Sequence, residues 1–554
     1  MLTELDRRFD AMLAEVTGPG GRLVIGRDER GQAILTNFPD TLPSLFRTFS
    51  SLNAEAEALV AGDERLTFAE LDHISECAAH GLAARGIGKG DLVGIAMRNC
   101  PAWIVGYMAI VKAGAVATLF NGWWEAHELE HALALTDPKL VIADAPRAKR
   151  IAARCPDRAI LTIAIERPVE TALAELLQDR DEDSILPEVS AEDDATLLFT
   201  SGSTGESKGA LSTHRAVTTA TYAYATGLIV LKGILEQDGN PPPTPRTLLS
   251  VPLFHVTGEL PVMINSFVVG RCMVVMPKWD AAEALRLIEK ERITYFVGVP
   301  TMSLELMSHP DREKYDLSSL RDITAGGAPR PVSHVERLQA EFPDAQPALG
   351  YGLTETNAAG CANYWGNYAA KPASTGRAQK PFVDLAILGA GDRHLPAGEA
   401  GEIGIRTAAN IKCYCRNPEA TAALFTPDGF VRTGDIGYLD EDGYLFIVDR
   451  KKEIIIRGGE NISAAEVESA CYACPEVAEV SVFGVPDERL GEVPLAIVHL
   501  RQDAAITEAE LRGFLEGRLA RFKIPDRFIF SADPLPRLGT GKFDRRALKA
   551  QYSR

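Results

Sequence analysis

Apolar positions recur along the first part of the chain with two alternating periods. Between residues 68 and 82 they follow the spacing of one helix face. The continuous apolar run at 92–97, which comes next, has the pattern of a buried strand. The same succession recurs at 102–120 and at 281–300, with Gly and Pro between the units. This alternation predicts a large α/β body built mainly on parallel sheet. The apolar residues of the first helical stripe are Phe68, Leu71, Ile74, Ala78 and Leu82.

The pattern changes after residue 384 to short alternating runs separated by Gly, Pro and Asp. Such runs are typical of a small antiparallel or barrel-like unit, which we expect over 384–449. From residue 450 a helix at about 463–473 and two strongly apolar strands indicate a small α+β module. We therefore expect a large N-terminal domain, residues 1–449, and a small C-terminal domain, residues 450–554.

Composition and charge narrow the class of protein. The 58 Lys and Arg residues against 76 Asp and Glu give a formal charge of −18, which argues against a nucleic-acid partner. No window approaches the roughly 18 consecutive apolar residues of a membrane helix, so no transmembrane segment is predicted. Nine thinly spread cysteines and the lack of a secretory signal in the first residues favour a cytoplasmic location. The oligomeric state, a homodimer included, stays open.

The segment TSGSTGESKG, residues 200–209, is the most informative stretch for chemistry. It follows an apolar strand and holds five hydroxyl residues, three glycines and one lysine. Converging backbone N–H groups, hydroxyls and the charge of Lys208 could bind phosphate oxygens. Ser207 and Gly209 depart from the Walker pattern. Composition alone supports a flexible surface loop equally well, but the preceding strand and the lysine favour phosphate binding.

A second segment, GYGLTETNAAG at 350–360, offers both kinds of group that a nucleotide needs. The ring of Tyr351 can stack on a base, and the oxygens of Thr354 and Glu355 suit Mg²⁺. Alone this pattern is weak, because Gly-rich turns with one acid are common on protein surfaces.

Two further segments carry a carboxylate or cations at turns. Asp435 lies in the turn TGD and could accept both hydroxyls of a ribose, although turn capping is the ordinary role of such an Asp. The run DRKK at 449–452 stands at the junction between the two predicted domains. Near the C-terminus, Lys542 lies in the Gly-rich segment PRLGTGK.

Taken together and in this order, these motifs resemble the adenylate-forming superfamily, which includes acyl-CoA synthetases, adenylation domains of nonribosomal peptide synthetases and firefly luciferase. TSGSTGESKG is similar to its phosphate loop, GYGLTET to its adenine and magnesium motif, and TGD to its ribose aspartate. DRKKEIIIRGGENI is similar to its hinge and thioester motif, and PRLGTGK to its catalytic-lysine motif. The likeness covers about residues 66–548.

The resemblance implies an AMP-forming acid–CoA ligase that uses ATP, Mg²⁺ and CoA. A carboxylic acid and ATP would form an acyl adenylate with release of pyrophosphate, and the acyl group would then pass to CoA. Lys542 would bridge the carboxylate and the α-phosphate, and Glu355, with Thr354 and the hydroxyl of Ser203, would hold the metal. The implied ATP-binding residues are Thr200, Ser201, Gly202, Ser203, Thr204, Gly205, Lys208, Gly327, Ala328, Tyr351, Asp435 and Arg450.

The resemblance also implies that the small domain is a mobile lid. Members of the family rotate it about a hinge so that one face serves adenylation and the other thioester formation. Lys452 matches the hinge position, and Gly458 and Gly459 match the loop that lines the pantetheine tunnel.

The substrate branch is indicated by PLFHVTGE, residues 252–259. Amino-acid-activating relatives have Asp where this chain has His255, so an amino acid is disfavoured and His255 is expected to gate an acyl pocket. Thr257 stands where plant coumarate ligases usually have an aromatic residue, which disfavours a phenylpropanoid. A medium- or long-chain fatty acid is our favoured substrate. Aryl, terpenoid or steroid side-chain acids, loading of a carrier protein, a luciferase-like reaction and a lapsed nucleotide- or acyl-binding regulator are the alternatives.

Overall fold

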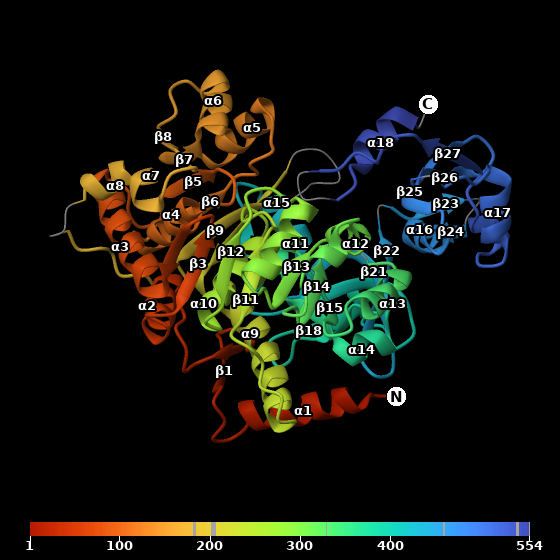
Figure 1. Cartoon of the computed structure of the whole chain (residues 1–554), viewed down its shortest axis with the longest axis horizontal. Coiled ribbons are helices and arrows are strands. Elements are labelled where there is room, and N and C mark those ends of the chain that lie inside the picture. Colours follow the sequence, from red (N-terminus) through yellow and green to blue (C-terminus); the bar gives the residue numbers. More distant parts are fainter. Residues whose placement is uncertain are drawn as a thin grey trace.

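The computed structural model of the chain is shown in Figure 1. It describes residues 1–180, 184–200, 207–327, 330–451, 453–457, 460–502, 504–538 and 542–552. A large body holds the chain up to the end of β22 (Tyr444–Arg450), and a smaller lobe from β23 (Ile455–Arg457) to α18 (Arg545–Tyr552) lies beside it. No helix among the described residues is long and apolar enough to cross a membrane.

Two large sheets form the frame of the body. Within the described residues one sheet has thirteen strands and the other seven, and the central strands of both run parallel, as the alternating pattern predicts. The larger sheet has the order β18 (Asp384–Leu388), β19 (Gly401–Arg406), β21 (Val431–Leu439), β22, β17 (Gly376–Ala378), β16 (Gly360–Tyr364), β15 (Gln346–Gly352), β14 (Asp322–Gly326), β13 (Tyr295–Gly298), β11 (Arg246–Leu249), β12 (Cys272–Val275), β3 (Glu57–Ala61) and β4 (Glu64–Thr67). The smaller sheet has the order β20 (Cys413–Tyr414), β10 (Gly209–Thr213), β9 (Asp194–Phe199), β6 (Val116–Leu119), β5 (Leu92–Ala96), β7 (Leu140–Asp144) and β8 (Ile160–Ile163).

The first apolar stripe of the sequence is confirmed as a helix of the body. In α3 (Phe68–Ala84) Thr67 and Glu70 make a capping box at the N-terminus, and the apolar stripe is buried in the main core. The long helix α9 (His214–Gln237) follows β10 directly, with Thr213 as its N-cap. The other main helices are α1 (Glu4–Thr17), α2 (Leu42–Leu52), α4 (Pro101–Lys112), α5 (Ala126–Thr136), α6 (Ala145–Arg154), α11 (Ala281–Lys290), α12 (Pro300–Ser308), α13 (Val332–Glu341) and α15 (Pro418–Leu424).

The strands of the region 384–449 extend the larger sheet. β18, β19, β21 and β22 are antiparallel neighbours, and β22 pairs with β17, which joins them to the central strands. This arrangement brings residues of β21 and β22 next to the end of β15. The grouping of 384–449 as a separate barrel-like unit stays a prediction.

The small lobe has its own sheet and core. The predicted helix and strands are confirmed as α16 (Ala464–Tyr472), β25 (Val477–Asp487) and β26 (Gly491–Leu500), and β23, β24 (Glu460–Ile462) and β27 (Arg527–Ser531) complete the sheet. Helix α17 (Glu508–Glu516) packs on the apolar core of this sheet. The chain crosses from the large sheet to the small one between Arg450 and Ile455.

Candidate active site

Two neighbouring parallel strands of the larger sheet end in glycine. Gly326, the last residue of β14, pairs directly with Gly350 of β15. Carboxyl ends of parallel strands lie at the same edge, where α/β proteins usually bind their ligands. Both glycines are partly exposed although the preceding residues, Ala325 and Leu349, are buried. The sheet is therefore accessible at this edge.

Asp435 and Arg450 face each other on β21 and β22 beside this edge. The two residues are register partners, and Arg450 Nε lies 3.4 Å from Asp435 Oδ1. Tyr351 on β15 donates its hydroxyl proton to Asp435 Oδ2 at 2.7 Å. Asp435 is buried, and burial raises its pKa against the opposing attraction of Arg450. The structure thus unites three residues that lie in separate motifs of the sequence.

Glu355 is joined to the flank of the phosphate-loop segment through Tyr414. Glu355 lies in a short 3₁₀ turn, Thr354–Thr356, directly after β15, and its Oε1 accepts a hydrogen bond from Tyr414 Oη at 2.7 Å. The Nζ of Lys208 lies 4.7 Å from the centre of the Tyr414 ring. The backbone N–H of Thr200 donates to the carbonyl of Lys208 at 2.9 Å, which closes the base of the loop between β9 and β10.

Lys542 reaches from the small lobe into the large body. A Cβ atom at Gly327 would lie 3.4 Å from Lys542 Cε, so the lysine packs against the segment that follows β14. The pKa of Lys542 is lowered to about 8, chiefly by burial and then by the neighbouring Arg450, while Asp435 and Glu453 oppose the shift. A cation is therefore held beside the Asp435–Arg450 pair.

His255 also lies near the charge of Lys542. It is half-buried just before the π-helix η1 (Gly258–Ile264), and its Nδ1 accepts a hydrogen bond from the N–H of Thr257 at 3.3 Å. Burial, together with the charge of Lys542, lowers the pKa of His255 to about 3. The imidazole is neutral at physiological pH, so it adds no positive charge to the site.

Family models match most of the chain. The model described as AMP-binding enzyme matches residues 46–415, and the model of the AMP-binding enzyme C-terminal domain matches residues 466–542. The chain belongs to the AMP-binding enzyme family. This confirms the resemblance to adenylate-forming enzymes that the five motifs indicate.

Relatives and solved structures similar to this AMP-binding enzyme cover nearly all of it. The long-chain-fatty-acid–CoA ligase of Bacillus subtilis (strain 168) is 33% identical over 92% of this chain and 94% of the relative. The feruloyl-CoA synthase of Amycolatopsis sp is 34% identical over 90% of this chain and 97% of the relative. The crystal structure of ATP-bound MatB from Rhodopseudomonas palustris is 29% identical with a TM-score of 0.82, over 92% and 99% of the two chains. The protein is an AMP-forming acid–CoA ligase.

Several predicted site residues of this AMP-binding enzyme lie outside the described residues. Of the predicted ATP-binding residues in the phosphate loop, the structure describes Thr200 and Lys208, and of the two predicted after β14 it describes Gly327. The roles of Thr200, Lys208 and Gly327 stay predictions, and so do the roles of the predicted residues that the structure does not describe. The predicted residues outside the described ranges are Ser201, Gly202, Ser203, Thr204, Gly205, Ala328, Lys452, Gly458 and Gly459.

Two tyrosines at the site were not singled out from the sequence. Tyr414, the partner of Glu355, lies in the two-residue strand β20. Tyr224 on α9 donates its hydroxyl proton to the carbonyl of Ala358 at 2.6 Å. Neither tyrosine lies in a motif that the sequence analysis identified, so its aromatic character was the only signal in the sequence.

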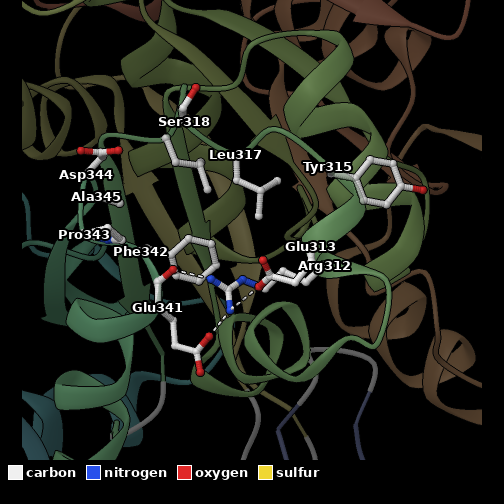
Figure 2. A pocket seen from close by; sticks show the side chains of 11 residues that line it. Arg312, Glu313, Tyr315, Leu317, Ser318, Glu341, Phe342, Pro343, Asp344 and Ala345 are labelled. Atoms are coloured by element: carbon white, nitrogen blue, oxygen red, sulfur yellow. Dashed lines mark hydrogen bonds and ion pairs between the residues drawn. The ribbon is translucent and has the colours of Figure 1, made fainter.

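A surface cavity of about 190 Å³ lies elsewhere on the large body (Figure 2). Its walls include Arg312, which is paired with Glu341, and Phe342, on which the guanidinium stacks. Its residues at 341–345 precede β15 and those at 312–320 precede β14, so it lies at the amino edge of the sheet, opposite the site of this AMP-binding enzyme. We assign it no part in the reaction.

Proposed function

We propose that this enzyme activates an apolar carboxylic acid, with a medium- or long-chain fatty acid favoured, and transfers it to CoA. The observation that carries the proposal is the partly buried Lys542 between Gly327 and the Asp435–Arg450 pair. A carboxylate and a triphosphate repel each other, so their reaction needs a cation held in place before they meet.

In the first step a carboxylate oxygen attacks the α-phosphorus of ATP, and the bond from that phosphorus to the bridging oxygen breaks. Pyrophosphate leaves with the electron pair, and no proton needs to be transferred. Lys542 would contact both the carboxylate and the α-phosphate, and the phosphate-loop segment with Lys208 would bind the β- and γ-phosphates. Asp435, held by Tyr351 and Arg450, would accept the ribose hydroxyls, and the ring of Tyr351 would contact adenine.

Glu355 is the described residue best suited to hold Mg²⁺. Its Oε1 is oriented by Tyr414, and no hydrogen bond from a described residue engages Oε2, which leaves an oxygen ligand of the kind that Mg²⁺ prefers. Thr354 precedes it in the same turn and offers a hydroxyl. When bound, the metal would neutralise charge on the phosphate oxygens.

In the second step the sulfur of CoA attacks the acyl carbon, the bond from that carbon to the AMP oxygen breaks, and AMP leaves while the thiol loses its proton. Lys542 lies in the small lobe and has no part in this step, so rotation of the lobe would remove it from the site. The short connection between Arg450 and Ile455 is where such a rotation would take place.

An apolar acid fits the residues that surround the open glycines. Thr257 lies against Gly326 and Tyr224 lies against Gly350, and the neutral His255 is hydrogen-bonded to the backbone of Thr257. None of these side chains carries a charge that would pair with a charged tail. The similarity to a long-chain-fatty-acid–CoA ligase supports an apolar acid, and the similarity to a feruloyl-CoA synthase keeps an aryl acid as the second candidate.

The test is pyrophosphate release with MgATP across straight-chain, aryl, steroid side-chain and amino acids, each with and without CoA. We expect release with fatty acids and completion to the thioester only when CoA is added. Lys542→Ala should lose pyrophosphate release by two to three orders of magnitude but still convert supplied acyl adenylate to acyl-CoA. Pyrophosphate release with aryl acids alone would show that the substrate is an aryl acid and not a fatty acid. Release that does not lead to a thioester when CoA is added would indicate another acceptor. Equal loss of both half-reactions in Lys542→Ala would contradict the division of labour.

A further inference from the structure

A row of small residues runs across the face of the larger sheet, away from Lys542. Gly326 of β14 pairs with Gly350 of β15, and Gly350 in turn pairs with Ala362 of β16. Ala362 pairs with Arg377 of β17, which pairs with Tyr444 of β22. Register partners on neighbouring strands project to the same face of a sheet. The first three residues therefore form a shallow floor that begins at the site and continues across the sheet.

Helix α9 approaches this floor through the side chain of Tyr224. A Cβ atom at Gly350 would lie 3.9 Å from Tyr224 Oη, and a Cβ atom at Gly326 would lie 4.0 Å from Cγ2 of Thr257. The Tyr224 hydroxyl is anchored to the carbonyl of Ala358 at 2.6 Å. Tyr224 is only partly buried, whereas its neighbours Ala223 and Ala225 are buried. The phenol thus lies over the middle of the row, at the edge of an accessible space.

A cavity of about 60 Å³ lies at the far end of the same row, between α1, α9, β16 and β17. Ala362, Arg377 and Tyr444 line it from the sheet, and Gly227 lines it from α9, one turn beyond Tyr224. Figure 1 shows α1 packed against the end of α9. Residues of α1 form the wall of the cavity on that side. The open glycines and the cavity therefore lie at the two ends of one row of register partners, and Tyr224 contacts the middle of that row at Gly350.

The lining of the cavity is polar and incompletely satisfied. Among the described residues, Thr226 Oγ1, Asn363 Oδ1 and Gln379 Nε2 are buried without a hydrogen-bond partner, and all three residues line the cavity. An apolar tail that entered it would displace water from these atoms, which is unfavourable unless the tail offers a polar group in exchange.

We propose that Tyr224 determines the length of the acid that the enzyme accepts. The inference rests on the proposed function and deepens it. The tail of the acid lies over Gly326 and Gly350 and ends at the phenol ring, which keeps it out of the polar cavity under α1. Removal of the ring joins the two spaces, so the enzyme then takes longer acids, above all those that carry a hydroxyl at the far end.

The experiment measures kcat/KM for pyrophosphate release with straight-chain acids of increasing length and with ω-hydroxy acids of the same lengths. Wild-type enzyme is compared with Tyr224→Ala and Tyr224→Phe. In Tyr224→Ala the ratio of kcat/KM for a longer acid to that for the best wild-type acid should rise roughly ten-fold or more. The rise should be larger in the ω-hydroxy series. Tyr224→Phe keeps the ring and should keep the wild-type length profile.

Tyr222 supplies a matched control on the same helix. Its hydroxyl donates to the carbonyl of Pro39 at 2.5 Å and its ring contacts Phe38, so it is buried on another side of α9. Tyr222→Ala removes a similar volume and should leave the length profile unchanged. Thermal unfolding of each variant tests whether it folds, and Tyr224→Leu, which retains apolar bulk, replaces Tyr224→Ala if that variant does not.

The outcomes separate this inference from the proposed function. A wild-type enzyme that activates no acid contradicts the proposed function itself. A folded Tyr224→Ala or Tyr224→Leu variant with the wild-type length profile in both series overturns the role of Tyr224. A shift of equal size in Tyr222→Ala overturns it as well, because the effect would then come from a loosened helix.

Discussion

At the scale of single residues, the role proposed for Lys542 depends on its charge state. The pKa of this lysine is lowered to about 8 by burial and by Arg450, so the cation is present below pH 8 and is lost as the pH rises through that value. We expect kcat/KM for pyrophosphate release, measured without CoA, to fall about ten-fold per pH unit above pH 8. His255, with a pKa lowered to about 3, should cause no loss of activity between pH 5 and 7.

The control for this pH profile is Lys542→Arg. Because a guanidinium stays protonated at every pH of the assay, whatever activity this variant retains should show no fall near pH 8. A wild-type profile without the alkaline fall, or the same fall in Lys542→Arg, would show that another group governs the reaction. A loss centred near pH 6.5 would contradict a neutral His255.

At the scale of elements, the shortest strand of the smaller sheet has a large effect on the geometry of the site. β20 has two residues, and its pairing with β10 places Tyr414 against Glu355 on one side and Lys208 on the other. Tyr414→Phe removes the hydrogen bond to Glu355 Oε1 and retains the ring under Lys208. A hydrogen bond to a charged acceptor contributes about 1.5–3 kcal/mol, so we expect at least a roughly ten-fold weaker pyrophosphate release at low Mg²⁺.

The measurement is the Mg²⁺ concentration that gives half-maximal release, and this concentration should rise in Tyr414→Phe. At high Mg²⁺ the rate of release by Tyr414→Phe should approach the wild-type rate. Tyr438→Phe is the control, because Tyr438 stacks on Phe446 on β21 and β22 and makes no contact with Glu355. An unchanged Mg²⁺ dependence in Tyr414→Phe would contradict the role of Glu355 as a metal ligand.

The same elements show how far sequence reasoning reaches. The helix α16 and the strands β25 and β26 were predicted because their apolar periodicity is local, and the motifs around Tyr351, Asp435 and Lys542 were found because each is short and contiguous. The contact of Tyr414 with Glu355 could not be predicted, because the two residues are 59 positions apart and the strand that carries Tyr414 is too short to show a periodic pattern. Tyr224 escaped because Tyr222 stands two positions away in the same run of small residues, and only the packing of α9 on the sheet shows which ring faces the row of glycines.

At the scale of the whole molecule, the position of Lys542 brings the small lobe to the candidate site. Lys542 of the lobe and Glu453 of the connecting segment lie close to Asp435 and Arg450 of the body, so this arrangement is the one that the proposed adenylation step would need. The lobe is connected to the body through the few residues between β22 and β23. A rotation that removes Lys542 must change backbone dihedral angles there, because the strands on either side are fixed in separate sheets.

Lys452, the predicted hinge residue, lies in this connection and outside the described residues. Lys452→Pro fixes φ near −65° at that position, so we expect acyl-CoA formation from supplied acyl adenylate to fall ten-fold or more while pyrophosphate release stays near the wild-type rate. Lys452→Ala removes the same side chain but leaves the backbone free, and it should preserve both half-reactions. Loss of CoA transfer in both variants would point to the lysine side chain rather than the backbone. Full activity of Lys452→Pro would contradict a hinge at this residue, and the rotation would then have to take place elsewhere between Arg450 and Ile455.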